Sequence, residues 1–404
     1  MDLKTVAAQQ AEHYDSFYLY DESRILEDTA RLRRNFPQVE FLYSIKCNSN
    51  PHVARCVFAQ GFGADAASLG EVLLAREAGL APERIFYSAP GKTLSDLRQA
   101  LTQSIVIADS FEELKRLDQI CGEMGAAMSA GVRINPNFSF FGGEGQASKF
   151  GIDEEQLFAF WSENTLQHVK ITGIHVHLRS QELHVPALAR YYENMLSLAD
   201  RVQKALGYEL EYVNLGSGMG IQFSPRDRPL DVEALGQAVG QQLDAFKRAN
   251  PGTRLLIESG RYAVGKSGVY VSKVLDRKVS RGVTYLILKN TLNGFSRPSL
   301  AQMVRRFSPE ADPAPWEPLF TCRDAFAIQT LKDEPPCETV HLVGNLCTAA
   351  DIAAEGVELP RLDCGDVVLF TNAGAYAAVI TSMQFASLER PAELFLRADG
   401  RILR

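Results

Sequence analysis

Lys46 stands at the end of an apolar run that has the character of a buried strand. The stretch Phe41 to Pro51 reads FLYSIKCNSNP, so this run leads straight into an ammonium group. A lysine in a site that excludes water has a lowered pKa and can present a free amine to an aldehyde. The pattern is typical of a lysine that forms a Schiff base with an aldehyde cofactor.

Two further stretches could hold the two ends of such a cofactor. The glycine-rich loop NLGSGMG, from Asn214 to Gly220, offers backbone N–H groups to a phosphate. In ESGR, Glu258 could keep a pyridine nitrogen protonated and Arg261 could bind a phosphate. Together these stretches indicate pyridoxal phosphate, although a glycine-rich turn by itself needs no ligand.

Two histidines, His175 and His177, lie two residues apart in the run ITGIHVHL. In a strand, residues two apart point to the same face, and His177 is the nearer of the two to the C-terminal end. Either ring could serve a site, or could be a core histidine with satisfied hydrogen bonds. A polar residue at the end of a strand could likewise belong to a site, or could be polar only because the end of the strand meets solvent.

The composition limits what the chain could bind. It has 404 residues, of which 46% are hydrophobic and 23% charged, and a net charge of −7, so nothing favours nucleic acid or an anionic membrane as a partner. The seven cysteines are scattered and form no C-x-x-C spacing, which argues against a disulfide framework and a zinc site. No apolar stretch resembles a signal peptide or a membrane span. We expect a cytoplasmic protein without a metal.

Short apolar runs alternate with amphipathic helical windows such as SLGEVLLAREA through the first two thirds of the chain. Eight such units over roughly 230 residues are the expected size of a closed (β/α)8 barrel, in which working residues lie at the C-terminal ends of the strands. The expected strands are Phe41–Lys46, Gly63–Ser68, Arg84–Ser88, Ser104–Asp109, Gly131–Asn135, Ile171–Leu178, Tyr212–Gly216 and Leu255–Glu258.

After Arg261 the pattern changes to short β-branched runs separated by turns, which predicts a mostly antiparallel β domain. The runs are SGVYVSKVL, GVTYLILK, AFAIQTL, TVHLVG, DVVLF, AAVIT and AELFL. The early run FYLYD could add a strand to this domain, and the proline-rich stretch from Pro309 to Pro318 is expected to be a surface loop. We expect the barrel at residues 24–268 and the β domain at 1–23 and 269–404.

Seven motifs in order over nearly the whole chain resemble the fold-type III pyridoxal phosphate decarboxylases, the group of diaminopimelate and ornithine decarboxylases, which share an alanine racemase-like barrel and a β domain. YSIKCNSNP resembles the lysine motif around Lys46, and GADAASLGE the segment whose aspartate, here Asp65, lies near that lysine. GIHVHLRSQ implies that His177 stacks on the cofactor ring and that Ser180 binds its phosphate.

The remaining motifs complete the resemblance. NLGSGMG implies phosphate binding by Gly216, Ser217 and Gly218, and ESGRY makes Glu258 the partner of the pyridinium. The other residues implied are Arg261 as a phosphate or substrate contact, Tyr376 of NAGAY near the phosphate, and Cys347 of GNLCTAAD. The resemblance implies a head-to-tail homodimer with shared active sites, in which Cys347 reaches the partner's site and is the candidate proton donor.

Departures from the family pattern bear on the substrate. In diaminopimelate and ornithine decarboxylases, an acidic residue directly follows the cysteine and recognises a distal amine. In this chain that position is Thr348, and Lys289 stands where an aspartate is common. Asp351 could substitute for the missing acid, and Arg297 matches the arginine that contacts a distal carboxylate in diaminopimelate decarboxylases. In H-x-H-x-G-S-Q, Arg179 replaces the glycine and adds positive charge. Because an unpaired buried ammonium is costly, a free diamine is disfavoured.

We therefore expect decarboxylation of an amino acid whose distal end is anionic, conjugated or carrier-bound, in the siderophore and antibiotic branch of the family. A diaminopimelate decarboxylase that makes L-lysine is the alternative. A racemase is disfavoured, because racemases of this fold place an arginine where Glu258 stands. A regulator without cofactor is disfavoured, because the chain retains the whole set of Lys46, His177, Glu258, Arg261 and Cys347.

Overall fold

The computed structural model describes residues 3–163, 166–311, 316–322 and 324–404. The chain forms two compact units, one made of residues 29–220 and 230–260, the other of residues 1–28, 221–229 and 261–404. We call them the barrel unit and the β unit. The domain bounds expected from the sequence stay a prediction. Within the described ranges, no helix is long and apolar enough to span a membrane.

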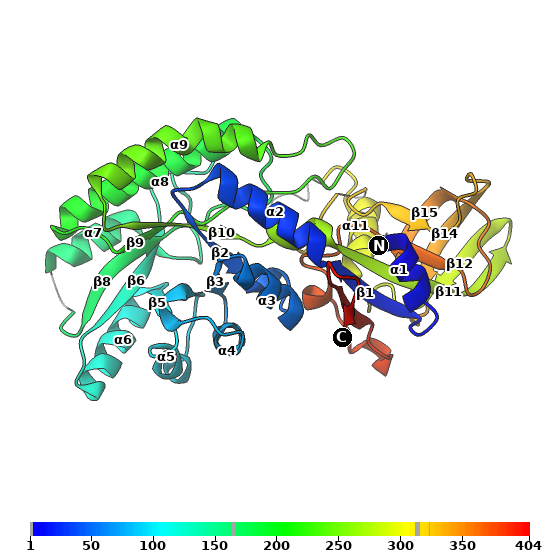
Figure 1. The fold of residues 1–404 in the computed structure, drawn as a ribbon, viewed down its shortest axis with the longest axis horizontal. Coiled ribbons are helices and arrows are strands. Elements are labelled where there is room, and N and C mark those ends of the chain that lie inside the picture. Colours follow the sequence, from blue (N-terminus) through cyan, green and yellow to red (C-terminus); the bar gives the residue numbers. More distant parts are fainter. Residues whose placement is uncertain (1–2, 164–165, 312–315, 323) are drawn as a thin grey trace. The chain divides into compact units, whose positions relative to one another are not determined.

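The barrel unit contains a closed parallel barrel, because β5 pairs with both β4 and β6 and so completes the ring (Figure 1). Its strands are β2 (Glu40–Ser44), β3 (Gly63–Ala66), β4 (Ile85–Ser88), β5 (Ile105–Ala108), β6 (Met128–Asn135), β8 (Val169–His175), β9 (Tyr212–Asn214) and β10 (Arg254–Ser259), with β7 (Ile152–Asp153) pairing beside β6. The eight strands predicted from the apolar runs all form, which confirms the (β/α)8 fold.

A helix precedes each barrel strand along the chain. These helices are α2 (Glu22–Asn35), α3 (Pro51–Ala59), α4 (Leu69–Glu77), α5 (Leu94–Ala100), α6 (Phe111–Met124), α7 (Glu154–Glu163), α8 (Val185–Leu206) and α9 (Val232–Ala249), and the short 3-10 turns η1 (Ile45–Cys47) and η2 (Pro82–Arg84) lie between elements. Six of the eight expected C-terminal strand ends differ from the structure by one to three residues. Lys46 lies in η1 rather than in a strand, and β8 ends at His175 rather than at Leu178. His177 is therefore a loop residue just beyond β8.

Tyr212 fills part of the barrel interior, where it packs edge-on against Phe86 with 5.0 Å between ring centroids. The neighbouring strands carry glycines at the points of contact. A Cβ added at Gly173 would lie 2.1 Å from the Tyr212 ring, and one added at Gly131 would lie 2.0 Å from its hydroxyl. Gly131 and Gly173 are therefore required because a large ring occupies the space of their side chains.

The β unit is a mostly antiparallel sheet, as predicted. Its elements are α1 (Leu3–Gln10), β1 (Ser16–Asp21), α10 (Arg261–Val264), η3 (Gly265–Ser267), β11 (Gly268–Ser280), β12 (Val283–Leu288), α11 (Ser296–Phe307), β13 (Ile328–Thr330), β14 (Glu338–Gly344), β15 (Ile352–Leu359), β16 (Val367–Phe370), η5 (Ala378–Ile380), η6 (Phe385–Ser387), β17 (Ala392–Leu396) and β18 (Ile402–Leu403). The pairs β1–β17 and β12–β14 are parallel.

Three details of the β unit differ from, or add to, the sequence prediction. The run AAVIT forms the 3-10 turn η5 instead of a strand, so that prediction was wrong. Strand β15, whose sequence IAAEGVEL contains a glycine and two glutamates, was not predicted, and neither was helix α11. The early run FYLYD does form β1, which pairs with β11 and β17.

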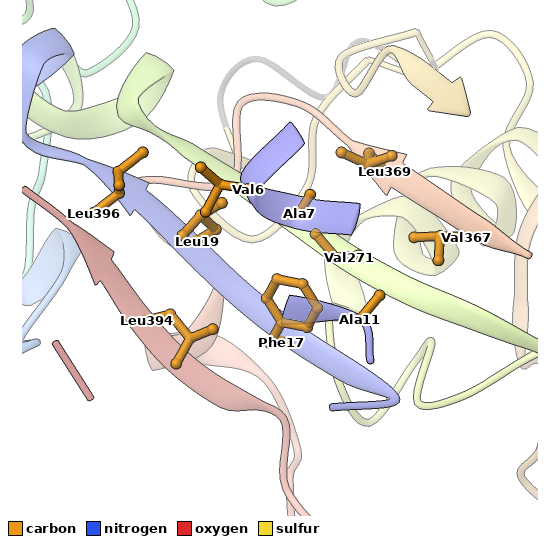
Figure 2. Close-up of a cluster of buried hydrophobic side chains, with 10 residues drawn as sticks. All are labelled: Val6, Ala7, Ala11, Phe17, Leu19, Val271, Val367, Leu369, Leu394 and Leu396. Atoms are coloured by element: carbon orange, nitrogen blue, oxygen red, sulfur yellow. The ribbon is translucent and has the colours of Figure 1, made fainter. Parts of the chain in front are cut away.

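Helix α1 covers one face of this sheet (Figure 2). Val6 and Ala7 of α1 pack against Phe17 and Leu19 of β1, and the cluster continues onto β11, β16 and β17. All of its members are buried. Residues 6, 7 and 11 are thus part of the core of the β unit.

We predict that Gly173→Ala lowers the free energy of unfolding by about 1–3 kcal/mol, because the added methyl group would overlap the Tyr212 ring. Gly240→Ala is the matched control. Gly240 lies in α9, and a methyl group added there would meet no atom within 4 Å, so alanine should stabilise by up to about 1 kcal/mol. Urea unfolding of the two variants measures both effects, and equal stabilities would contradict the packing argument.

Candidate active site

Lys46 reaches the barrel mouth from the turn that follows β2. Its Nζ lies 2.6 Å from Oδ2 of Asp65, which β3 places beside it through the register of Ser44 with Asp65. The Lys46 side chain is 39% exposed, whereas that of Asp65 is 2% exposed. Burial raises the pKa of Asp65, and the nearby Glu258 acts in the same direction. The predicted neighbour of the lysine thus holds its amine through a direct ion pair.

The residues after Lys46 build the start of helix α3. The Asn48 side chain accepts a hydrogen bond from the Asn50 backbone N–H. The Asn50 side chain in turn caps α3 by accepting from two backbone N–H groups, and Pro51 is the first helical residue. Asparagine is favoured as the cap because its side chain accepts hydrogen bonds from the first backbone N–H groups of the helix. Proline is favoured as the first helical residue because the N–H group that it lacks would have no partner within the helix. The sequence CNSNP therefore fixes the turn that carries the lysine.

Glu258 is a buried carboxylate on β10, 2% exposed. Its Oε1 lies 2.9 Å from Nε2 of His175 and accepts a hydrogen bond from Nδ2 of Asn214 at 3.0 Å. Burial alone would raise the pKa of Glu258, but His175 and the nearby Lys46 hold it well below its usual range. Ser88, which ends β4, lies 3.0 Å from the other nitrogen of the His175 ring. The surroundings of Glu258 therefore favour its ionised form and orient its carboxylate.

His177 lies beside this carboxylate, with Nδ1 3.7 Å from Oε2 of Glu258. Its backbone carbonyl accepts a hydrogen bond from Arg133, and its Nε2 lies 3.5 Å from the Ser180 hydroxyl. Although 26% of the side chain is exposed, Nδ1 is buried, and burial lowers the pKa of His177 to about 3. The ring is therefore neutral near pH 7.

The glycine-rich loop is attached to the same cluster. Oδ1 of Asn214 accepts a hydrogen bond from the Gly216 N–H, so this N–H is already used inside the protein. Gly216 has a φ of +62°, and a Cβ there would lie 2.2 Å from the carbonyl of Val176. In the described part of the chain, the N–H groups of Ser217 and Gly218 have no acceptor. These two N–H groups can donate hydrogen bonds to a phosphate.

The barrel mouth therefore fits pyridoxal phosphate on its own geometry. It offers an amine at Lys46, a buried anion at Glu258 for a protonated ring nitrogen, and two N–H donors at residues 217–218 for a phosphate. The charge of Arg179, in contrast, is neutralised within the loop, because its Nε lies 3.1 Å from the buried Glu182. Among the described residues, no cluster of histidine, cysteine and acidic side chains could hold a metal.

The β unit carries a second group of predicted site residues. Arg261 begins α10 and Arg297 lies in the first turn of α11, and both side chains form ion pairs with Glu317, at 3.0 and 2.9 Å. Tyr376 lies under Arg261, with 4.8 Å between the guanidinium and the ring centroid, and has a φ of +52°. A left-handed conformation is costly for a tyrosine, which indicates that the surrounding structure fixes this ring.

The loop from Asn345 to Asp351 carries the remaining predicted residues. Cys347 is exposed and Thr348 half-buried. Asp351 is 3% exposed, and its carboxylate accepts hydrogen bonds from the Thr291 hydroxyl and from the backbone N–H groups of residues 292 and 346. This carboxylate is thus used to shape the loop. Lys289 is half-buried just after β12.

Three contributors to these clusters were not singled out from the sequence. Ser88 and Arg133 lie on barrel strands, and the strand-end rule could have found Ser88. Glu317 lies in the proline-rich stretch that was expected to be a surface loop, yet its side chain is only 4% exposed. That expectation was wrong for Glu317, because the two arginines require a counter-ion that no local sequence pattern reveals.

The comparisons with known proteins agree with this geometry. Residues 22–265 match the family model described as "Pyridoxal-dependent decarboxylase, pyridoxal binding domain". A relative from Niallia circulans, L-glutamyl-[BtrI acyl-carrier protein] decarboxylase, is 30% identical over 98% of this chain and 92% of its own length. Diaminopimelate decarboxylase from Aquifex aeolicus is 27% identical over 90% of this chain and 83% of its own.

A solved structure shows the same fold. Diaminopimelate decarboxylase from Helicobacter pylori, complexed with L-lysine, is 25% identical with a TM-score of 0.80, and the match covers 98% of this chain and 95% of that one.

We predict that His177→Gln reduces the acid sensitivity of folding. Because the folded-state pKa of about 3 lies below the ordinary value of 6.5, the contribution of the neutral ring is complete above pH 6.5 and is lost as the pH falls toward 3. Relative to the variant, the wild type should lose up to about 1.4 kcal/mol of unfolding free energy per pH unit in this window. Urea unfolding at several pH values measures this difference, and parallel curves would contradict it.

Proposed function

Since this chain belongs to the pyridoxal-dependent decarboxylases, we propose that it removes the α-carboxylate of an amino acid whose distal end is conjugated or bound to a carrier protein. The observation that carries this proposal is the loop at Cys347, where Thr348 supplies no charge and Asp351 is already used by three hydrogen bonds. A free distal ammonium would have no acidic partner from this loop. The carrier-protein relative from Niallia circulans supports the same substrate class and a role in secondary metabolism.

The residues of the barrel mouth have distinct roles in this reaction. Pyridoxal phosphate, when bound, would supply an aldehyde for the substrate's amine and a ring that can accept electrons from the bond to the carboxylate. Lys46 holds the cofactor, and Asp65 keeps the lysine amine oriented. Glu258 stays ionised and so keeps a proton on the ring nitrogen, which strengthens the electron sink. His177 and Ser180 hold the ring and the phosphate, together with residues 216–218.

Cys347 is the proposed proton donor to the carbon that loses the carboxylate. Cys347 is exposed, so its thiol is accessible to a partner subunit. We propose a homodimer with shared active sites, in which this thiol serves the partner's site. Arg261, Arg297 and Tyr376 are the proposed contacts to the phosphate or to the distal end of the substrate, and Lys289 lies in a segment proposed for the same end. We place the protein in a reducing cytoplasm, because its seven cysteines are scattered and no disulfide joins them within the described residues.

Diaminopimelate decarboxylase is the second candidate, because several relatives and the H. pylori structure carry that name. Thr348 argues against it, since it provides no charge for a distal ammonium. A racemase needs a weaker electron sink, whereas the ionised Glu258 would strengthen the sink by keeping the ring nitrogen of the cofactor protonated.

We predict that Lys46→Ala abolishes covalent cofactor attachment. Borohydride reduction of the wild type loaded with pyridoxal phosphate should add one cofactor mass to the peptide containing Lys46. The variant should show no such addition and should lose activity by at least about 1,000-fold, since a covalent step is removed. A cofactor-labelled peptide elsewhere in the chain would contradict the assignment, and no labelling of the wild type would favour a regulator.

We predict that carbon dioxide release is fastest with a conjugated amino acid. Free diaminopimelate, lysine and ornithine should be compared with γ-glutamyl thioesters on an acyl-carrier protein and with small amide-linked analogues. The linked substrates should exceed each free diamine by at least about 100-fold in kcat/KM, because burying an unpaired ammonium costs several kcal/mol. A free diamine that turns over fastest would favour the diaminopimelate alternative.

We predict that Cys347→Ala lowers kcat by about 100-fold or more, the usual effect of losing a general acid. Cys364→Ala is the matched control, because Cys364 is also an exposed free cysteine in the β unit, and it should retain wild-type kcat. Mixed dimers of Cys347→Ala with Lys46→Ala should recover one working site, whereas inactive mixtures would contradict sharing of sites between subunits.

A further inference from the structure

We propose that Glu317 is a built-in counter-ion that occupies the anion site formed by Arg261 and Arg297, and that it thereby excludes substrates with a free distal carboxylate. This inference rests on the proposed function, in which Arg297 serves the distal end of the substrate. It narrows the substrate class to amino acids whose distal end is uncharged, such as amides and thioesters.

The three side chains form a buried ionic cluster within the β unit. Arg297 is completely buried, and its Nη2 donates to both carboxylate oxygens of Glu317, at 3.0 and 2.9 Å. Arg261, whose side chain is 4% exposed, reaches the same carboxylate at 3.0 Å. One carboxylate therefore serves two guanidinium groups that come from two different helices, α10 and α11.

Aromatic rings enclose this cluster. Phe223 lies near both guanidinium groups, at 5.3 Å from Arg261 and 5.1 Å from Arg297. Phe326 contributes a second face, 5.2 Å from Arg297. Ion pairs in such surroundings are little screened by water, so each charge strongly affects its neighbours. Burial lowers the pKa of Arg297 only to about 10, and the guanidinium therefore remains charged at neutral pH.

The two arginines have more hydrogen-bond donors than the carboxylate of Glu317 satisfies. Within the described residues, Nε and Nη1 of Arg297 and Nη2 of Arg261 are buried and have no hydrogen-bond acceptor. Two cations and one anion also leave one positive charge in excess. Removing the charge of Glu317 would thus leave a site with two buried cations and free donors, which is suited to a carboxylate.

While Glu317 is present, a second carboxylate would have to approach it at short range in an environment of low polarity. Like charges repel strongly there. A carbonyl oxygen of an amide or a thioester carries no net charge and meets no such repulsion. Glu317 is therefore a specificity residue that separates linked substrates from free dicarboxylic amino acids.

The test uses Glu317→Gln, which keeps the shape of the side chain and removes its charge, in the holoenzyme. Glu310→Gln is the matched control, because Glu310 is exposed and lies in the same proline-rich stretch. Carbon dioxide release from free L-glutamate and from a γ-amide of glutamate gives the ratio of kcat/KM for the two substrates. We expect this ratio to shift toward free glutamate at least tenfold in the variant and to stay unchanged in the control.

Binding of glutarate, measured by calorimetry and by the shift in Tm, provides a readout that needs no turnover. Glutarate should bind the Glu317→Gln variant at least tenfold more tightly than the wild type. The double variant Glu317→Gln/Arg297→Gln should lose this gain, because one of the two cations is gone. Equal glutarate affinity in the wild type and the single variant would overturn the proposal, as would a wild type that prefers free glutamate to the amide.

The two proposals can fail separately. If no linked amino acid is decarboxylated but glutarate binds only the single variant, the proposed substrate is wrong and the counter-ion role stands. If Glu317→Gln does not fold alone, added acetate should raise its yield and Tm by refilling the site. A failure of acetate to do so would show a purely structural ion cluster and would overturn the proposal.

Discussion

The buried charge of Glu258 is the constraint on which the barrel mouth depends. An isolated carboxylate in the protein interior costs several kcal/mol, so its neighbours must be donors. His175 and Asn214 fill that role, and each is held in turn. Ser88 fixes the far nitrogen of His175, while the other end of the Asn214 amide accepts from Gly216. One side-chain amide therefore ties the proposed partner of the cofactor ring to the loop that is proposed to receive its phosphate.

In the barrel unit, the residues that pack the interior are different from the polar residues at the strand ends. Its interior is packed around Tyr212, which demands glycines on the neighbouring strands and leaves little freedom for change. Polar groups gather where the strands end, on elements held by this packing. The β unit supplies a different kind of surroundings. There, Arg261 and Arg297 are enclosed by aromatic rings and share Glu317, so charge rather than shape decides what else can enter.

Much of the barrel could be predicted from the sequence, because its strands are continuous apolar runs buried on both faces and its helices are amphipathic. Lys46, Asp65 and Glu258 followed from strand ends and from the family motifs. The β unit was harder. Strand β15 contains a glycine and two glutamates, and AAVIT has strand composition but forms a 3-10 turn, because pairing partners far along the chain decide such short segments. Glu317 could not be found, since its burial is set by two distant arginines.

The most direct test of the account is to follow the α-carbon during turnover in deuterium oxide, with a carrier-linked or amide-linked amino acid as substrate. An ionised Glu258 that keeps the ring nitrogen protonated favours loss of the carboxylate, followed by return of one proton to the same carbon. We expect one carbon dioxide for each amine formed, and one deuterium on the former α-carbon. Recovery of the amino acid with exchanged deuterium and inverted configuration, without carbon dioxide, would contradict it and would identify a racemase.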